Sequence, residues 1–179
     1  MDSLRKYAFL LFLCLGFFLR GQEYETILWS RDYRLSWSDF KGKVPDSPRA
    51  AATTASGISY EFSTVSNKKG KYELDYTVST FFYPNKSWYQ PKLCDEVILG
   101  HEQLHFDISE LFARKMRRLM DEASFTENVK NEVKAIYRKI NEELAAFQQM
   151  YDRETNFSRD REKQAEWNEK IAKALRPQY

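Results

Sequence analysis

Residues 97–119 read VILGHEQLHFDISELFARKMRRL, and this stretch decides the fold of the C-terminal half of the chain. Its apolar residues recur every three or four positions, which predicts an α-helix that buries one face. Leu104 and Ile108 belong to the buried stripe, and so do His101 and His105. The only two histidines of the chain therefore lie one turn apart on the inner side of this helix.

The spacing His101-Glu102-x-x-His105 indicates metal chemistry. Two histidines four positions apart on a helix can bind one zinc ion, and the glutamate between them can act as general base. A lone buried histidine is more often a hydrogen-bonded core residue, but two without a metal would need partners for four ring nitrogens. The motif therefore predicts a Zn2+ site in which His101 and His105 are ligands and Glu102 is catalytic.

A catalytic zinc site has a third protein ligand and one open position for water. Because no other histidine exists, a carboxylate must supply that ligand. A second amphipathic helix is predicted from about residue 126, and its short connection to the first helix makes the two pack antiparallel. Side chains lean toward the N-terminus of their own helix, so the ligand is expected near residues 150–154. Asp152 and Glu154 lie there, whereas Glu143 would reach toward the turn.

Residues 24–83 lean toward β-structure. Residues 58–63 and 72–79 alternate apolar and polar side chains, which predicts an antiparallel hairpin with one buried face. Short strands are expected at residues 24–29 and 34–37.

Residues 94–175 lean toward helix. Besides the two helices described above, residues 161–175 predict a third one, whose inner side carries Trp167 and Ile171. The expected fold class is therefore α+β: a small antiparallel sheet, then a helical hairpin that carries the motif, then a C-terminal helix.

The N-terminus has the features of a secretory signal. Arg5 and Lys6 precede an apolar run at residues 7–19, which is too short to span a bilayer comfortably. We expect residues 1–21 to be a signal peptide, with an uncleaved membrane anchor as the alternative. Residues 22–179 would then form a single domain that is secreted or periplasmic.

Composition narrows the range of partners. Removing residues 1–21 leaves 25 basic and 25 acidic residues (28 less 3, and 26 less 1), so the net charge does not favour nucleic acid. A membrane partner is expected only through the signal segment, if it stays uncleaved. Cys94 is the one cysteine left, which excludes an internal disulfide, and the domain must rely on a core rich in aromatic residues.

Several stretches of the chain resemble a known family. They are residues 35–42, 51–53, 87–88, 99–108 and 151–155, with Gln164 and Trp167. Together they resemble a family of bacterial proteins that is catalogued as a domain of unknown function and described as secreted zinc-dependent proteases. The resemblance implies a zincin-like fold, and it favours Asp152 over Glu154 as third ligand because Asp152 belongs to the shared pattern. In one departure, Phe157 stands where the family usually carries a histidine.

These observations lead to two hypotheses about function. In the first, the chain is an exported zinc-dependent metallopeptidase that hydrolyses peptide or protein substrates, with Glu102 as general base. The strand edge at residues 72–83 would align an extended substrate, and Tyr151 is either a second oxyanion donor or a core residue. In the second, the chain is a catalytically weak or inactive envelope protein that binds or supports others. Phe157 favours the second hypothesis, whereas Glu102 favours the first because a structural site needs no base.

Overall fold

The structure is a computed structural model that describes residues 25–66 and 72–176. The expected signal peptide at residues 1–21 and the turn between the hairpin strands lie outside the described residues. Among the helices that are described, none combines the length and the apolar character that crossing a membrane requires.

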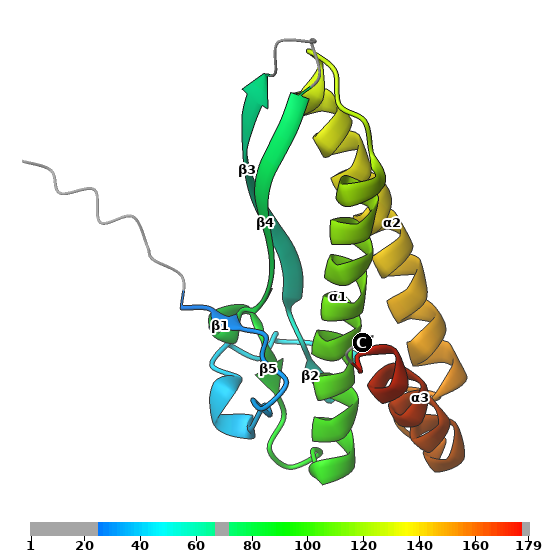
Figure 1. The fold of residues 1–179 in the computed structure, drawn as a ribbon. Coiled ribbons are helices and arrows are strands. Elements are labelled where there is room, and N and C mark those ends of the chain that lie inside the picture. Colours follow the sequence, from blue (N-terminus) through cyan, green and yellow to red (C-terminus); the bar gives the residue numbers. More distant parts are fainter. Residues whose placement is uncertain (1–24, 67–71, 177–179) are drawn as a thin grey trace, which may run out of the picture.

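The sheet is antiparallel, and a long hairpin dominates it (Figure 1). The two hairpin strands pair along their whole length, with Tyr60 opposite Val78, and they confirm the predicted hairpin. A short third strand lies beside one hairpin strand, and two further strands form a separate pair. In chain order the strands are β1 (Ile27–Leu28), β2 (Ala52–Thr53), β3 (Ser56–Ser66), β4 (Tyr72–Phe82) and β5 (Trp88–Tyr89), with sheet orders β1-β4-β3 and β2-β5.

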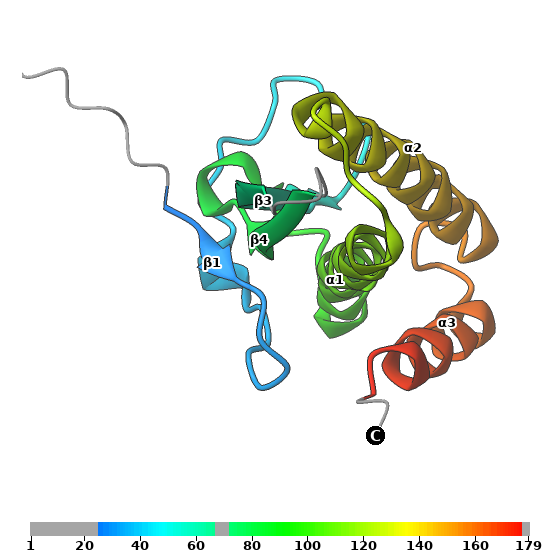
Figure 2. The same ribbon diagram turned by 45° about the horizontal axis from the view of Figure 1, so that its top comes forward.

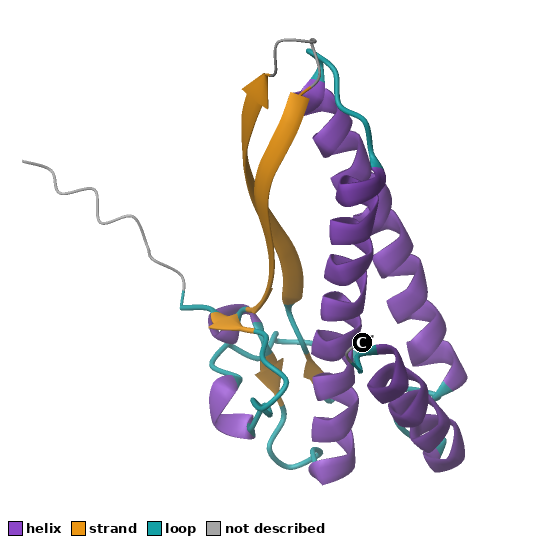
Figure 3. Cartoon of the chain, viewed as in Figure 1, coloured by secondary structure: helices purple, strands orange, loops and turns teal. Residues whose placement is uncertain are grey.

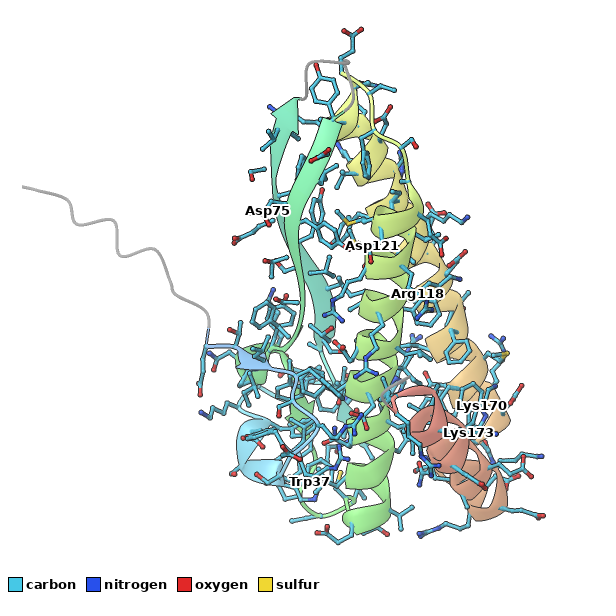
Figure 4. All side chains as sticks on the ribbon, viewed as in Figure 1. Trp37, Asp75, Arg118, Asp121, Lys170 and Lys173 are labelled. Carbon is cyan, nitrogen blue, oxygen red and sulfur yellow. The ribbon has the colours of Figure 1, made fainter. Side chains whose placement is uncertain are left out.

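The hairpin buries one face, as its alternating sequence predicts. Ile58 and Val78 are buried, whereas Glu61 and Asp75 on the other face are exposed. The Asp75 side chain points away from the helices (Figure 4). The apolar face packs on the first long helix, which lies beside the hairpin.

Three helices follow the sheet: α1 (Glu96–Glu122), α2 (Val129–Glu154) and α3 (Arg161–Ala174). The α1 helix begins at its observed position because the Asp95 carboxylate accepts hydrogen bonds from the first backbone N–H groups of the helix. It lies between the hairpin and the other two helices (Figures 2 and 3). A small antiparallel sheet followed by three helices confirms the predicted α+β class.

The core surrounds α1 on two sides. Ile108 and Met116 pack with residues of α2 in the larger cluster of buried side chains. Phe106 packs with Phe82 in a second cluster on another side of the same helix. The sequence predicted one buried stripe along α1. The structure instead buries α1 over most of its circumference, because both clusters pack on it.

Three sequence expectations about local structure differ from the observed elements. Residues 34–37 form no strand. The Leu35 N–H donates to the Gln103 side chain at 2.8 Å, which holds this segment against α1 instead of against another strand. The strand expected at residues 24–29 forms in part, because among the described residues 25–29 only Ile27 and Leu28 belong to a strand, β1. The second helix begins at Val129 rather than near Thr126, since the Thr126 hydroxyl donates to Glu132 instead.

Candidate metal centre

Three side chains converge between α1 and α2: His101, His105 and Asp152. The Nε2 atoms of His101 and His105 lie 3.1 and 3.0 Å from the same Asp152 oxygen, Oδ1. One ligand atom from each residue lies within 4.8 Å of the other two, which is close enough to bind a single ion. The two histidines come from one helix and the carboxylate from the last turn of its antiparallel neighbour.

A glutamine side chain holds each imidazole from behind. His101 Nδ1 lies 2.9 Å from Gln164 Oε1 on α3, and His105 Nδ1 lies 2.6 Å from Gln148 Oε1 on α2. An amide oxygen only accepts hydrogen bonds, so each Nδ1 carries the proton and each Nε2 presents a lone pair to the cluster. Such outer partners fix the orientation and tautomer of metal-binding histidines.

The chemistry of this donor set fits a cation. Both Nε2 atoms and the Asp152 oxygen are acceptors, and they lie within 4.8 Å of one another. Acceptors this close require a positive charge between them, either protons on the imidazoles or a metal ion. Two imidazoles and one carboxylate are also a ligand set that catalytic zinc sites use.

The electrostatics of the cluster follow the same logic. Burial would raise the pKa of Asp152, but hydrogen bonds from His101 and His105 hold it well below its usual range. Burial by itself would lower the pKa of His105. The hydrogen bond to Asp152 and the nearby Glu102 carboxylate reverse that effect and raise it. The cluster therefore stabilises one ionised carboxylate and attracts positive charge.

Glu102 lies in the motif between the two histidines. Its side chain is buried, at 5% exposure, and its Oε2 atom has no hydrogen-bond partner within the described residues. The Glu102 backbone is held separately, because the Thr54 hydroxyl donates to its carbonyl oxygen at 3.2 Å. A buried carboxylate oxygen without a partner is costly, so such an atom points to a missing donor such as water.

Tyr151 is a core residue and not an oxyanion donor. Its ring stacks on His101 with centroids 4.5 Å apart. Its hydroxyl accepts a hydrogen bond from the Gln164 amide at 2.7 Å and donates to the His101 carbonyl oxygen at 3.3 Å. Burial raises the pKa of the Tyr151 phenol above its usual value. The residue supports the imidazole of His101 and has no free donor to offer a substrate.

Of the two carboxylates considered as third ligand, only Asp152 joins the histidines. Glu154 Oε2 instead accepts a hydrogen bond from the indole N–H of Trp167 at 2.9 Å. Residues two positions apart on a helix point to different sides, so one turn of α2 cannot present both to the same ion.

Phe157 lies on a left-handed turn that follows α2. Asn156, Phe157 and Ser158 have φ angles of 46°, 53° and 69°, a conformation that costs non-glycine residues roughly 1–2 kcal/mol each. The Phe157 N–H donates to the Asp152 carbonyl oxygen at 2.8 Å, and the ring is 56% exposed. The cluster assembles from His101, His105 and Asp152, without a side chain from position 157.

The substrate edge expected at residues 72–83 is contradicted for the C-terminal part of β4. Strand β4 is the central strand of its sheet, with β3 on one side and β1 on the other. On the β1 side, the Thr80 carbonyl oxygen accepts from the Trp29 N–H, and the Val78 carbonyl oxygen accepts from Arg117. Together with β1, these contacts occupy this edge of β4 from Val78 to Phe82.

Sequence reasoning missed Gln148 and Gln164 as members of the site. Gln164 is only 5% exposed, in a helix whose other buried residues are Trp167 and Ile171. A polar residue on an otherwise apolar inner stripe is the signal that would have identified it. Gln148 is half-buried and carries no comparable signal.

Comparison with known proteins places the chain in a family. A model described as "Bacterial protein of unknown function (DUF922)" matches residues 40–161, which include the His-His-Asp cluster and Glu102. No curated protein and no solved structure matches the chain. Since the matched region covers more than half of its length, the chain belongs to the DUF922 family of bacterial proteins of unknown function.

Proposed function

We propose that the chain is a zinc-dependent peptidase, with His101, His105 and Asp152 as ligands and Glu102 as general base. The observation that carries the proposal is the buried, unpartnered Oε2 atom of Glu102 in the helical turn that supplies both histidines. A structural metal site would not need a base there, whereas a hydrolytic site requires one. Three ligands also leave one coordination position for water.

Each residue has a distinct role in this proposal. The two imidazoles and Asp152 would hold the ion, which would supply a Lewis acid and lower the pKa of water. Glu102 Oε2 takes a proton from the attacking water and later delivers it to the leaving amine. Gln164 and Gln148 keep both Nε2 lone pairs directed at the ion. We also propose that the chain acts outside the cytoplasm, after export through residues 1–21.

A second function has one observation in its favour. The Tyr151 hydroxyl, the sequence candidate for a second oxyanion donor, instead donates to the His101 carbonyl oxygen within the core. A site without such a donor would be a weak catalyst, and the chain would then act as a metal-stabilised binding protein.

Metal content and turnover, measured on the same variants, separate the two functions. We expect about one zinc per chain in the wild type and none in His105→Ala, by elemental analysis. Glu102→Gln should keep zinc and lose cleavage of a peptide library that is read by mass spectrometry. Glu96→Gln, an exposed glutamate on the same helix, is the matched control and should keep both.

The outcomes are distinct. Equal cleavage by wild type and Glu102→Gln would exclude Glu102 as the base. Full zinc occupancy without cleavage in any variant would favour the binding protein.

A further inference from the structure

A cleft lies on another face of α1, away from the metal cluster. Its volume is about 420 Å³, and it is lined by the segment after β1, by α1, by α3 and by the residues that follow α3. On α1, Gly100, Gln103 and Asp107 line this cleft. His101 and His105 do not, because their positions turn them toward α2.

The cleft combines apolar walls with an excess of positive charge. Leu104, Ala172 and Leu175 contribute apolar surface, and Trp29 contributes an indole ring. Three arginines reach the same space from two segments of the chain: Arg31, Arg34 and Arg176. A concave, mostly apolar site with a few charged groups is the usual form of a small-molecule pocket, and its volume falls within the common range of ~300–1,000 Å³.

The single carboxylate in the cleft does not neutralise these arginines. Asp107 already accepts hydrogen bonds from the Trp29 indole at 2.8 Å and from the Gln103 amide at 3.0 Å. Its contact with Arg34 is long, at 3.6 Å, and the Arg34 side chain is 62% exposed. Arg31 uses one N–H to reach the Leu175 carbonyl oxygen and retains its other donors.

We propose that this cleft binds a small carboxylate with an apolar body. Arginine presents paired donors that match the two oxygens of a carboxylate, which explains the charge at the rim. The apolar wall formed by Leu104, Ala172 and Leu175 explains the need for a hydrocarbon portion. A free fatty acid of short chain and the C-terminal residue of a peptide share this chemistry.

The cleft is also linked to the metal cluster by one helix. Gln164, Asn168 and Ala172 follow one another at four-residue spacing along α3. The Gln164 amide donates to Asn168 Oδ1 at 2.9 Å, and Gln164 in turn holds His101. A ligand that touches Asn168 therefore lies two hydrogen bonds from a metal ligand.

Nuclear magnetic resonance locates the binding directly. The probes are hexanoate, N-acetyl-leucine and its uncharged amide, added to chelator-treated full-length protein whose side-chain N–H groups are observed. We expect the acids, but not the amide, to shift the signals of the Trp29 indole and the Asn168 amide. Preference for hexanoate would identify a free acid, and preference for N-acetyl-leucine a peptide terminus.

Three variants test the assignment. Arg34→Gln should weaken binding about tenfold, as expected for loss of a charged hydrogen bond. Ala172→Trp should abolish binding by filling the cleft, with folding checked by circular dichroism. Arg118→Gln, on a distant exposed part of α1 (Figure 4), should change nothing.

Several results would overturn the proposal. They are equal binding of the amide, equal competition by inorganic phosphate, or unchanged binding in Arg34→Gln. Binding that required zinc would assign the carboxylate to the metal cluster instead. Because the experiment uses metal-free protein and no turnover, its failure is distinguishable from failure of the proposed peptidase activity.

Discussion

The Nδ1 atom of His101 lies 2.9 Å from Gln164 Oε1, so a residue of the third helix sets the direction in which a residue of the first helix presents its lone pair. The same glutamine donates to the hydroxyl of Tyr151, whose ring stacks on that imidazole. The helix that follows the left-handed turn therefore contributes to the cluster without supplying a ligand.

Replacing Gln164 by leucine should weaken zinc binding by about 10–100-fold, the usual effect of losing an outer partner of a metal-binding histidine. Leucine fills a similar volume but cannot accept a hydrogen bond from His101 Nδ1. Competition with a chelator of known affinity measures the change. Gln149→Leu, on the exposed side of α2, is the control and should bind zinc like the wild type. Equal affinities in both variants would show that His101 needs no partner on α3.

Asp152→Asn and Glu154→Gln form a matched pair of neutralising changes on α2. Asp152→Asn should reduce zinc affinity by more than an outer partner does, because it removes an ionised ligand between two histidines. Glu154→Gln should leave zinc affinity unchanged, since Glu154 accepts from Trp167. The same chelator competition measures the zinc affinity of both variants. The reverse order of effects would make Glu154 the ligand.

Phe157→Gly should stabilise the metal-free protein by about 0.5 to 1 kcal/mol, because glycine adopts a positive φ without steric cost. Urea unfolding measures the free energy. Phe157→Ala keeps the Cβ atom and should show no such gain. Both variants should bind zinc like the wild type, since the cluster contains no side chain from this position. Zinc loss in Phe157→Ala would contradict the assignment of Asp152 as third ligand.

Gln103→Leu should destabilise the protein by about 1 to 3 kcal/mol, the cost of leaving buried polar groups without partners. Gln103 accepts from the Leu35 N–H and donates to Asp107, so both would lose a partner. Thermal unfolding or urea titration of the metal-free protein measures the loss. The zinc affinity of the variant should equal that of the wild type, because the Gln103 side chain contacts the Leu35 backbone and not the metal cluster. A stable Gln103→Leu protein would mean that water replaces the amide.

Tyr76 provides a test of pH dependence. Burial and the hydrogen bond that its phenol donates to Asp121 raise the pKa of Tyr76 to about 12. The folded pKa lies above the ordinary value of 10.0, so the neutral phenol stabilises the fold below pH 10. That contribution is lost as the pH rises through about 12.

Comparing wild type with Tyr76→Phe tests this directly. The difference in unfolding free energy should be largest near neutral pH and should shrink between pH 10 and 12. Urea titrations across this range measure it. In Asp121→Asn, which alters an exposed side chain at the end of α1 (Figure 4), the folded pKa of Tyr76 should lie closer to 10.0, so the pH-dependent loss should be smaller and complete at a lower pH. A difference that is independent of pH would exclude a titrating phenol.

Periodicity was sufficient to predict much of the architecture. The alternation at residues 58–63 and 72–79 is typical of a hairpin that exposes one face to solvent and buries the other. The hairpin forms as predicted. The stripe that carries His101 and His105 likewise predicted their shared direction. A sequence pattern predicts a helix or strand correctly when the periodicity of that helix or strand alone decides which of its faces is buried.

Tertiary contacts explain what the sequence could not show. The sequence around Leu35 is typical of a strand, but the Leu35 N–H donates to the side chain of Gln103, which lies 68 positions away in the chain. Asp152 and Glu154 both lie where the third ligand was expected, and tertiary contacts separate them: Asp152 meets both histidines, whereas Glu154 accepts from Trp167. The role of Gln148 depends on how α2 is rotated against α1, which no local pattern encodes. Gln164 differs, because its position on an otherwise apolar stripe is a local signal.

The cluster joins two helices through residues that lie 51 positions apart in the chain. An ion bound there would be a reversible cross-link that closes a long loop, and loop closure restricts the unfolded chain far more than the folded one. Metal supply would thus govern the lifetime of the protein as well as its chemistry. Without zinc, the open end of the α1–α2 hairpin would be the first part of the molecule to separate.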